Sequence, residues 1–248
     1  MKILRYLLAA GAGALLAALV LTLVPLSLSN IQRHAIEGVL ERYLDDHPEL
    51  VAKAIGQLDA RQKAAATERE RAAIEANATA LFNDPDDLVF GDPNGDVTIV
   101  EFFDYRCPYC KRALPAVMQT LKSDGHVRLV LKEFPILGPD SQLATRAALA
   151  SNKQGKYSAF HSAMLASTSA LNMTTIMSIA EANGIDTTRL QADMKAREID
   201  ALIRKNLQLA EGLKIEGTPA FIVGDKLIPG AVDQATLQNL VQSARKKS

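Results

Sequence analysis

The distribution of apolar and polar positions divides the chain into four stretches. Residues 6–28 are almost continuously apolar, and residues 31–82 are rich in alanine and charged residues with apolar positions at helical spacing. Short runs rich in β-branched and aromatic residues predict buried strands at 97–103, 127–132, 221–223 and 226–228. Apolar stripes from about 141 to 213 predict a helical block between the second and third runs. The pattern predicts an α/β layer fold with an inserted helical block, preceded by a helical segment.

A further helical pattern and several turn residues refine these elements. Residues 110–121 carry an apolar face at helical spacing and predict a helix directly after the first strand. The dipeptide Gly224-Asp225 predicts a hairpin turn between the last two strands, and a closing helix is expected from about Gln234. Two clusters of turn residues, 83–87 and 91–95, mark the entry to this α/β domain.

The helical segment, called the stalk below (residues 30–82), contains three apolar residues seven positions apart. These residues, the heptad seam, are Leu44, Val51 and Leu58. Seven is the coiled-coil interval, but two heptads are too short a run to establish a coiled coil. Self-association, packing on the chain's own domain and a solvated spacer all remain open from the pattern.

The N-terminus has the form of an export signal. Lys2 and Arg5 precede the apolar stretch, which is nearly long enough to span a bilayer as a helix. A cleaved signal peptide and an uncleaved membrane anchor over residues 6–28 both remain open, and either would place the residues after Asn30 outside the cytoplasm. We therefore expect three parts: a signal or anchor at 1–29, the stalk at 30–82 and an α/β domain at 83–248.

Composition adds limited information. Hydrophobic residues make up 48% of the chain, which is enough for a real core. Lys+Arg and Asp+Glu both number 28, so the formal net charge is zero and nothing favours a nucleic-acid partner.

The strongest chemical signal is the pair Cys107 and Cys110, the only cysteines in the chain. They lie two residues apart where the first predicted strand meets the following helix. At a helix N-terminus, unpaired N–H groups and the helix dipole favour a thiolate, which is the species that attacks disulfides. The position therefore predicts thiol–disulfide exchange, with Cys107 as the nucleophile and the exposed sulfur, and Cys110 one turn inside the helix as the resolving thiol.

Two other interpretations of the cysteine pair are less consistent with the chain. Zinc needs about four ligands, and the histidines occur singly, at positions 34, 47, 126 and 161. A structural disulfide across so short a loop would contribute only roughly 2 kcal/mol. We expect no metal and no cofactor for the main activity.

Three segments together resemble the thioredoxin superfamily, and within it the periplasmic DsbA-like thiol–disulfide oxidoreductases. They are Glu101-Phe102-Phe103-Asp104-Tyr105-Arg106-Cys107-Pro108-Tyr109-Cys110, Phe134-Pro135-Ile136 and Gly217-Thr218-Pro219-Ala220-Phe221. The resemblance covers roughly residue 84 to the C-terminus and implies a thioredoxin fold with an inserted helical domain. Glutaredoxins share the C-P-Y-C motif, but they lack the helical insert and the export segment.

Within this branch the chain is most similar to ScsC-type proteins, associated with suppression of copper sensitivity. These combine a DsbA-like domain with an N-terminal helical region like the stalk. In some members that region forms a trimer and the protein isomerises disulfides. The resemblance therefore implies a homo-oligomer assembled through residues 31–81.

The residues around the cysteines bear on the direction of exchange. Pro108 and Tyr109 stand where the strong oxidase DsbA carries Pro and His, and a tyrosine lacks the charge that stabilises the thiolate. A less stabilised thiolate makes a weaker oxidant. Thr218 precedes the motif proline, as in the isomerases DsbC and DsbG. By resemblance, Pro219 is cis and presents the Thr218 backbone to an extended substrate.

Glu101 lies six residues before Cys107 and has two candidate roles. A carboxylate beneath the dithiol could relay the proton that leaves or returns to Cys110. Alternatively, Glu101 would be a buried carboxylate paired with Lys132 on the neighbouring strand. The two roles are not exclusive.

We therefore expect exchange on exported proteins that carry cysteines or disulfides, in the periplasm, with a preference for isomerisation or reduction. An isomerase needs a reducing membrane partner, whereas the alternative, a monomeric DsbA-like oxidase, needs an oxidising one. A function of another class is Cu(I) binding by Cys107 and Cys110, since soft thiolates select that ion.

Overall fold

The computed structural model describes residues 29–246. The chain divides between Lys63 and Ala64 into two compact units. The first unit contains helix α2 (Asn30–Asp46) and the beginning of helix α3 (Pro48–Ala76). Ser29 caps α2 through a reciprocal contact with Gln32. The helix ends before Pro48 because a proline disfavours helical geometry in the residue that precedes it.

The second unit is built on one five-stranded sheet with the order β1-β3-β2-β4-β5. Its strands are β1 (Leu88–Gly91), β2 (Val97–Phe103), β3 (Val127–Glu133), β4 (Ala220–Val223) and β5 (Lys226–Pro229). Strands β2 and β3 are parallel, and the other neighbouring pairs are antiparallel. The remaining helices are α4 (Ala78–Phe82), α5 (Pro108–Asp124), α6 (Pro139–Ser151), η1 (Asn152–Gln154), α7 (Tyr157–Ala166), α8 (Met173–Ala182), α9 (Thr187–Asp193), α10 (Arg197–Gly212) and α11 (Gln234–Arg245).

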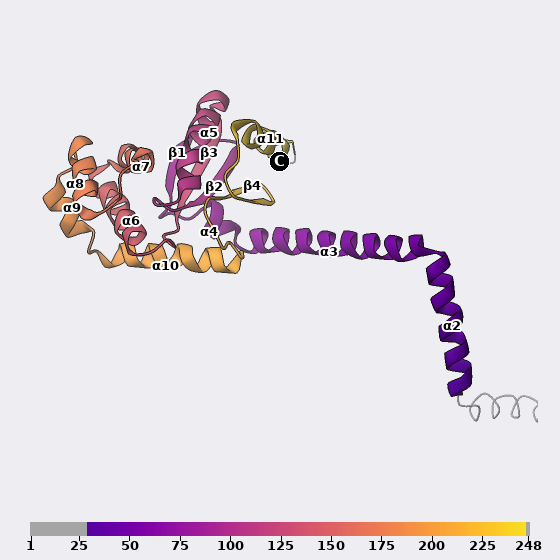
Figure 1. Ribbon diagram of the computed structural model, residues 1–248. Helices are drawn as coiled ribbons and strands as arrows, with labels where there is room; N and C mark the ends of the chain where they lie inside the picture. The colour runs from indigo at the N-terminus through magenta and orange to yellow at the C-terminus, as the bar shows by residue number, and fades with distance from the viewer. Residues whose placement is uncertain (1–28, 247–248) are drawn as a thin grey trace, which may run out of the picture. The chain divides into compact units, whose positions relative to one another are not determined.

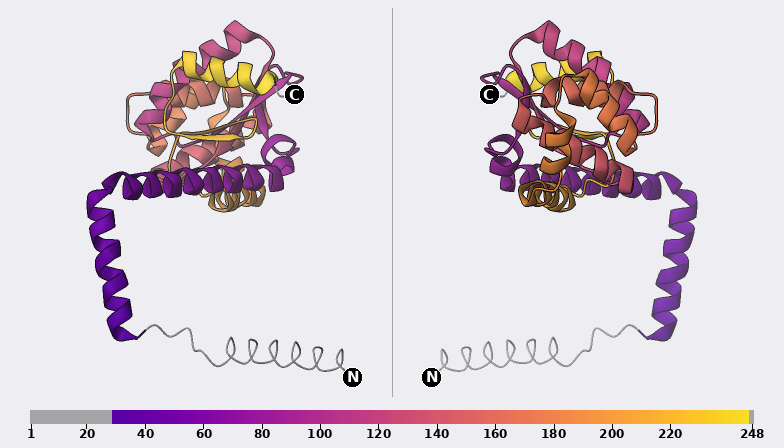
Figure 2. Two further views of the ribbon diagram at one scale, coloured as in Figure 1. Left: turned by 90° about the vertical axis from the view of Figure 1, so that its right-hand side faces the viewer. Right: turned by 90° about the vertical axis from the view of Figure 1, so that its left-hand side faces the viewer.

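Each face of the sheet is covered by helices. Helices α5 and α11 lie on one face and α10 on the other (Figure 1). Figure 2 shows the same layering from two sides, with α11 and α10 on opposite sides of the β4–β5 hairpin. Because side chains alternate between faces, Ile99 and Phe103 of β2 join the core beneath α5, whereas Val100 and Phe102 join the core beneath α10.

The predicted fold is confirmed: the chain is an α/β protein with a helical block between β3 and β4. Strand β2 and helix α11 begin at the predicted residues, and Gly224-Asp225 forms the turn between β4 and β5. Strand β1 was not predicted, because three of its residues lie between the two clusters of turn residues and Gly91 belongs to the second cluster. They form a strand through antiparallel pairing with β3, which is a tertiary effect.

The end of the stalk, from residue 64 on, is part of the second unit. Ile74 and Leu81 are 3% and 0% exposed and belong to the core beneath α10. The heptad seam in the first unit is exposed. No helix within residues 29–246 is long and apolar enough to cross a membrane. The predictions for residues 6–28 concern a segment outside the described residues.

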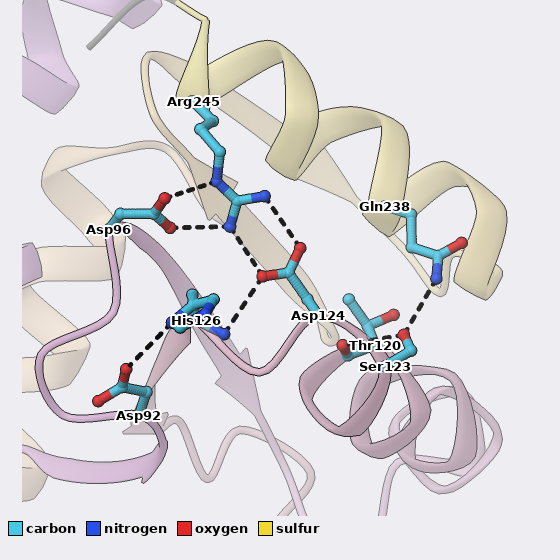
Figure 3. Close-up of polar contacts among 8 residues, drawn as sticks. All are labelled: Asp92, Asp96, Thr120, Ser123, Asp124, His126, Gln238 and Arg245. Carbon is cyan, nitrogen blue, oxygen red and sulfur yellow. Dashed lines mark hydrogen bonds and ion pairs between the residues drawn. The ribbon is translucent and has the colours of Figure 1, made fainter.

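The last turn of α11 is tied to two other elements by Arg245 (Figure 3). Its Nε lies 2.6 Å from Asp96 Oδ2 at the entry to β2, and its Nη2 lies 2.7 Å from Asp124 Oδ1 at the end of α5. These ion pairs depress the pKa values of both carboxyl groups, chiefly through hydrogen bonds from the guanidinium. The interaction joins the C-terminal helix to the sheet and to α5.

Candidate active site

The two cysteines lie where β2 passes into α5. Cys107 is the N-cap residue of the helix, and Pro108 occupies its first turn, where a missing N–H costs nothing. Cys110 lies within the first turn and is fully buried. We expected Cys107 to carry the exposed sulfur, but the residue is only 3% exposed, and its Sγ contacts the Thr218 backbone. The two thiols are not bonded to each other.

Thr218 contacts both cysteines. The Cys107 Sγ donates a hydrogen bond of 3.1 Å to the Thr218 carbonyl oxygen, and the Thr218 side chain forms a hydrogen bond with Cys110. The Thr218–Pro219 peptide bond is cis. The Pro219 carbonyl accepts a hydrogen bond of 2.8 Å from Gly230 N, which joins this loop to the residue after β5.

The two thiols differ in their surroundings. Burial raises the pKa of Cys110 well above its ordinary value, and the neighbouring Glu101 acts in the same direction. Hydrogen bonds from the Asp104 backbone and the Thr218 side chain act against this rise without cancelling it. Cys110 is therefore a thiol until a base removes its proton, whereas Cys107 caps the N-terminus of α5.

Glu101 is buried on the face of the sheet beneath α5, and burial alone raises its pKa to about 8. The predicted pairing of Glu101 with Lys132 is wrong. In the parallel register Glu101 lies opposite Leu131, and Lys132 lies opposite Phe102, so the two side chains point to opposite faces. Lys132 instead forms a buried ion pair with Asp87 and donates to the Ala80 carbonyl.

Tyr109 is exposed, as is Pro108, and 53% of the surface of Tyr109 is accessible. The Arg112 guanidinium lies 4.3 Å from the centre of its ring, one turn further along α5. Tyr109 lacks the charge that a histidine would supply, but the Arg112 cation is stacked on its ring. Cation–π stacking of this kind contributes on the order of 0.5–1 kcal/mol at an exposed site.

Asp104 is a site residue that the sequence did not reveal. It is fully buried between β2 and Cys107. Its carboxylate accepts hydrogen bonds from four groups, Arg106 N, Ile136 N, Leu137 N and Ser141 Oγ, at 2.8–3.0 Å. It joins the residues just before Cys107 to the loop that follows β3. The only sequence signal was an aspartate between a strand and the cysteine motif.

Glu133 forms a second buried hub that was not predicted. Its carboxyl group accepts hydrogen bonds from the hydroxyls of Tyr105, Tyr157 and Thr145 at 2.9–3.0 Å. Burial raises the pKa of Glu133 to about 8 despite these bonds. The Tyr105 hydroxyl also lies 2.9 Å from His161 Nδ1. The hub ties the residue two before Cys107 to helices α6 and α7 of the insert.

A groove of about 470 Å³ lies beside the Thr218–Pro219 loop. It is lined by Tyr109 of α5, by the segment from Lys214 to Ala220, by Leu227 and Pro229 of β5, by Gly230 and by Glu70 of α3. Lys214 is the only non-glycine residue with positive φ in the described part of the chain, at 57°. The groove adjoins both the cysteine motif and the end of the stalk.

The structure brings together Cys107, Cys110, Thr218 and Pro219, with Glu101 acting electrostatically on Cys110 from below. His126 is exposed, and His161 is buried in the hub. Within residues 29–246 no group of three or more His, Cys, Asp or Glu side chains could hold a metal ion. The Cu(I) hypothesis, which needs only the two thiols, stays a prediction.

The geometry defines a thioredoxin-type dithiol site, and the comparison with known families agrees. The DSBA-like thioredoxin domain matches residues 98–242. The chain belongs to this family of DsbA-like thiol–disulfide oxidoreductases.

Three solved structures illustrate the similarity. A thioredoxin-like oxidoreductase from Silicibacter pomeroyi DSS-3 is 50% identical, covers 68% of this chain and 98% of its own, and has a TM-score of 0.67. Proteus mirabilis ScsC in a transitional conformation is 26% identical over 90% of this chain and 99% of its own, with a TM-score of 0.67. Salmonella enterica Typhimurium BcfH is 27% identical over 86% and 96%, with a TM-score of 0.70. The chain is thus a DsbA-like protein close to the ScsC type.

Some curated relatives are much longer proteins, of which only a part matches this chain. The Na(+)/H(+) antiporter NhaA 3 of Salinispora tropica is 32% identical over 164 residues, which are 65% of this chain and 25% of the antiporter. The chain thus spans about a quarter of the length of the first curated relatives that it matches. The probable disulfide bond formation protein D of Bacillus anthracis is 28% identical over 55% of this chain and 69% of its own.

Proposed function

We propose that the protein catalyses thiol–disulfide exchange on exported proteins in the periplasm, and that it acts mainly as an isomerase or reductase. The observation that carries the proposal is the asymmetry of the dithiol. Cys107 caps α5 beside the Thr218 carbonyl, whereas Cys110 is buried with a raised pKa. One thiol is thus suited to attack, and the other stays protonated until a mixed disulfide has formed.

In the first step the Cys107 thiolate attacks one sulfur of a substrate disulfide. The substrate S–S bond breaks, a Cys107–substrate disulfide forms, and the other substrate sulfur leaves as a thiolate. In reduction, Cys110 loses its proton and attacks Cys107 Sγ, which releases the reduced substrate and leaves a Cys107–Cys110 disulfide. In isomerisation, a second substrate thiolate attacks the mixed disulfide and regenerates the Cys107 thiolate without net oxidation.

Glu101 is the candidate for the group that takes the proton from Cys110. It acts on the Cys110 thiol electrostatically, and its pKa of about 8 lets it exchange protons near neutral pH. We propose that Glu101 is the base for the resolving step and the acid for its reverse.

The preference for isomerisation rests on Tyr109, Thr218 and the stalk. Tyr109 lacks the charge of a histidine, and Thr218 forms hydrogen bonds with both cysteines. The exposed heptad seam is suited to contact other copies of the chain. We propose a homo-oligomer, with a reducing membrane partner that returns the dithiol to its free form.

Reactivation of scrambled ribonuclease, starting from the reduced protein, tests the direction of exchange. An isomerase restores ribonuclease activity catalytically, and Cys107→Ser abolishes it. Cys110→Ala accumulates a mixed disulfide with ribonuclease that is visible on a non-reducing gel. Rapid oxidation of reduced ribonuclease by the disulfide form, without reactivation of scrambled enzyme, would instead establish an oxidase.

The contribution of the stalk is tested with point variants in place of truncation at residue 82. Removing residues 30–81 would delete Ile74 and Leu81 from the core and confuse misfolding with loss of assembly. Aspartate at the three heptad-seam positions leaves the second unit intact. Loss of isomerase activity in that variant, with exchange on small disulfides retained, would link assembly to isomerisation.

A further inference from the structure

Strand β5 forms one edge of the sheet, and helix α3 covers part of that edge. Glu70 Oε1 accepts a hydrogen bond of 3.1 Å from Leu227 N, although the two residues are 157 positions apart. An edge strand normally leaves such N–H groups unpaired. Groups two residues apart along a strand face the same edge, so the next N–H there would belong to Pro229, which has none. Glu70 therefore binds the backbone donor that this edge offers.

Glu70 also lies in the groove beside the active site. The groove is lined by Tyr109, Thr218 and Pro219, which adjoin the cysteines, and also by Glu70 and Leu227. Its lining also includes Ile215 and Pro229 and is mainly apolar. An extended substrate bound to Cys107 at the Thr218–Pro219 loop would extend into this groove.

The contact at Glu70 is connected to the cysteines through backbone hydrogen bonds. Leu227 belongs to β5, and Gly230, directly after β5, donates to the Pro219 carbonyl at 2.8 Å. The neighbouring Thr218 carbonyl accepts from Cys107 Sγ at 3.1 Å. Holding β5 in place therefore holds the part of the groove that β5 lines in a defined position relative to the nucleophile.

We propose that Glu70 is a positioning residue for substrate binding: by holding β5 through Leu227 N, it shapes a groove for an apolar side chain of an extended polypeptide. This inference rests on the proposed exchange function and adds a substrate preference to it. The end of the stalk is then part of the substrate site as well as a connection to the first unit.

The test uses the full chain and three disulfides. Two are peptides whose cysteine carries a chromophoric thiol in disulfide linkage, with either leucine or glycine two residues away; the third is oxidised glutathione. We expect the parent protein to favour the leucine peptide about tenfold in kcat/KM, the effect of burying about half of a leucine side chain. Glu70→Ala should reduce this preference to less than twofold by raising KM, with kcat and the rate with oxidised glutathione unchanged.

Three variants make the result specific. Glu70→Gln keeps an oxygen acceptor for Leu227 N and should retain the preference. Glu75→Ala changes an exposed glutamate on the same helix and should have no effect. Glu70→Met keeps the length of the side chain without the acceptor, so it replaces Glu70→Ala if melting shows that the alanine variant is unfolded.

The outcomes separate this inference from the function on which it rests. If the parent exchanges with none of the three disulfides, the proposed function fails and the inference falls with it. If the parent exchanges but does not discriminate between the peptides, or if folded Glu70→Ala or Glu70→Met discriminates as the parent does, the function stands and the role of Glu70 is refuted.

Discussion

Replacing Glu101 by Gln should remove a large part of the pH dependence of stability. Glu101 is buried beneath α5, and burial raises its pKa from 4.5 to about 8. Glutamine has nearly the same shape and cannot ionise. The substitution therefore isolates the free energy of ionising this carboxyl group inside the protein.

The sign and size follow from linkage. The folded state retains the Glu101 proton up to a pKa of about 8, whereas the unfolded chain releases it near pH 4.5. The stabilising effect of the retained proton is fully present below the unfolded pKa and is lost as the pH rises through the folded pKa. At ~1.4 kcal/mol per pKa unit, the parent should lose about 3 kcal/mol of unfolding free energy between pH 5 and pH 8 that Glu101→Gln does not lose.

Urea denaturation at pH 5 and pH 8 measures this difference. Both proteins should carry Cys107→Ser and Cys110→Ser, so that thiol ionisation does not contribute. Burial also raises the pKa of Glu133 to about 8, but that group is present in both proteins and cancels in the comparison. Glu216→Gln is a matched control, because it changes an exposed carboxylate.

The reasoning fails if the parent and Glu101→Gln show the same change in unfolding free energy between the two pH values. It also fails if the control reproduces the effect of Glu101→Gln. A pH-independent offset between the two proteins would reflect the burial of the amide and would not support the prediction.

Three further predictions concern other parts of the molecule. Arg245→Ala should raise the pKa values of its two aspartate partners toward the ordinary value, as followed by NMR titration, and should lower the urea midpoint at pH 7. Because those pKa values are depressed in the folded state, this loss should vanish as the pH falls below 3.8, and a loss that persists in acid would contradict the ion-pair account. Aspartate at the heptad seam should convert an oligomer into a folded monomer in sedimentation experiments, since each apolar side chain buried in an assembly contributes on the order of 1.5–3 kcal/mol; an unchanged mass would exclude the seam as the interface. Thr218→Val should slow the resolving step about tenfold, because it removes a hydrogen bond that lowers the pKa of Cys110 and such a bond contributes on the order of 1.5 kcal/mol; mixed disulfides that resolve at the parent rate in quenched-flow samples would refute it.

Local patterns predicted much of the fold. Strand β2, the hairpin turn at Gly224-Asp225 and helix α11 lie where periodicity and turn chemistry placed them. These features depend on residues near one another in the sequence, so their signal is complete within a short window. Strand β1 did not meet that condition, since its four residues become a strand only by pairing with β3.

The chemistry of the site was also visible in the sequence, because only cysteine supplies a redox-active thiol and its position at a strand–helix junction determines which sulfur caps the helix. The surroundings of that dithiol could not be predicted from the sequence. Whether Glu101 meets Lys132 depends on the register of two parallel strands, which places the two side chains on opposite faces.

The sequence by itself thus determined most of the elements, the reactive residues and the family. The tertiary structure alone decided which buried groups act on them. Asp104 accepts hydrogen bonds from a loop more than 30 residues away in the sequence. Glu70 accepts one from Leu227, 157 residues away. The physical reason is that burial and strand register, which decide these contacts and the pKa of Glu101, arise only when distant segments pack together.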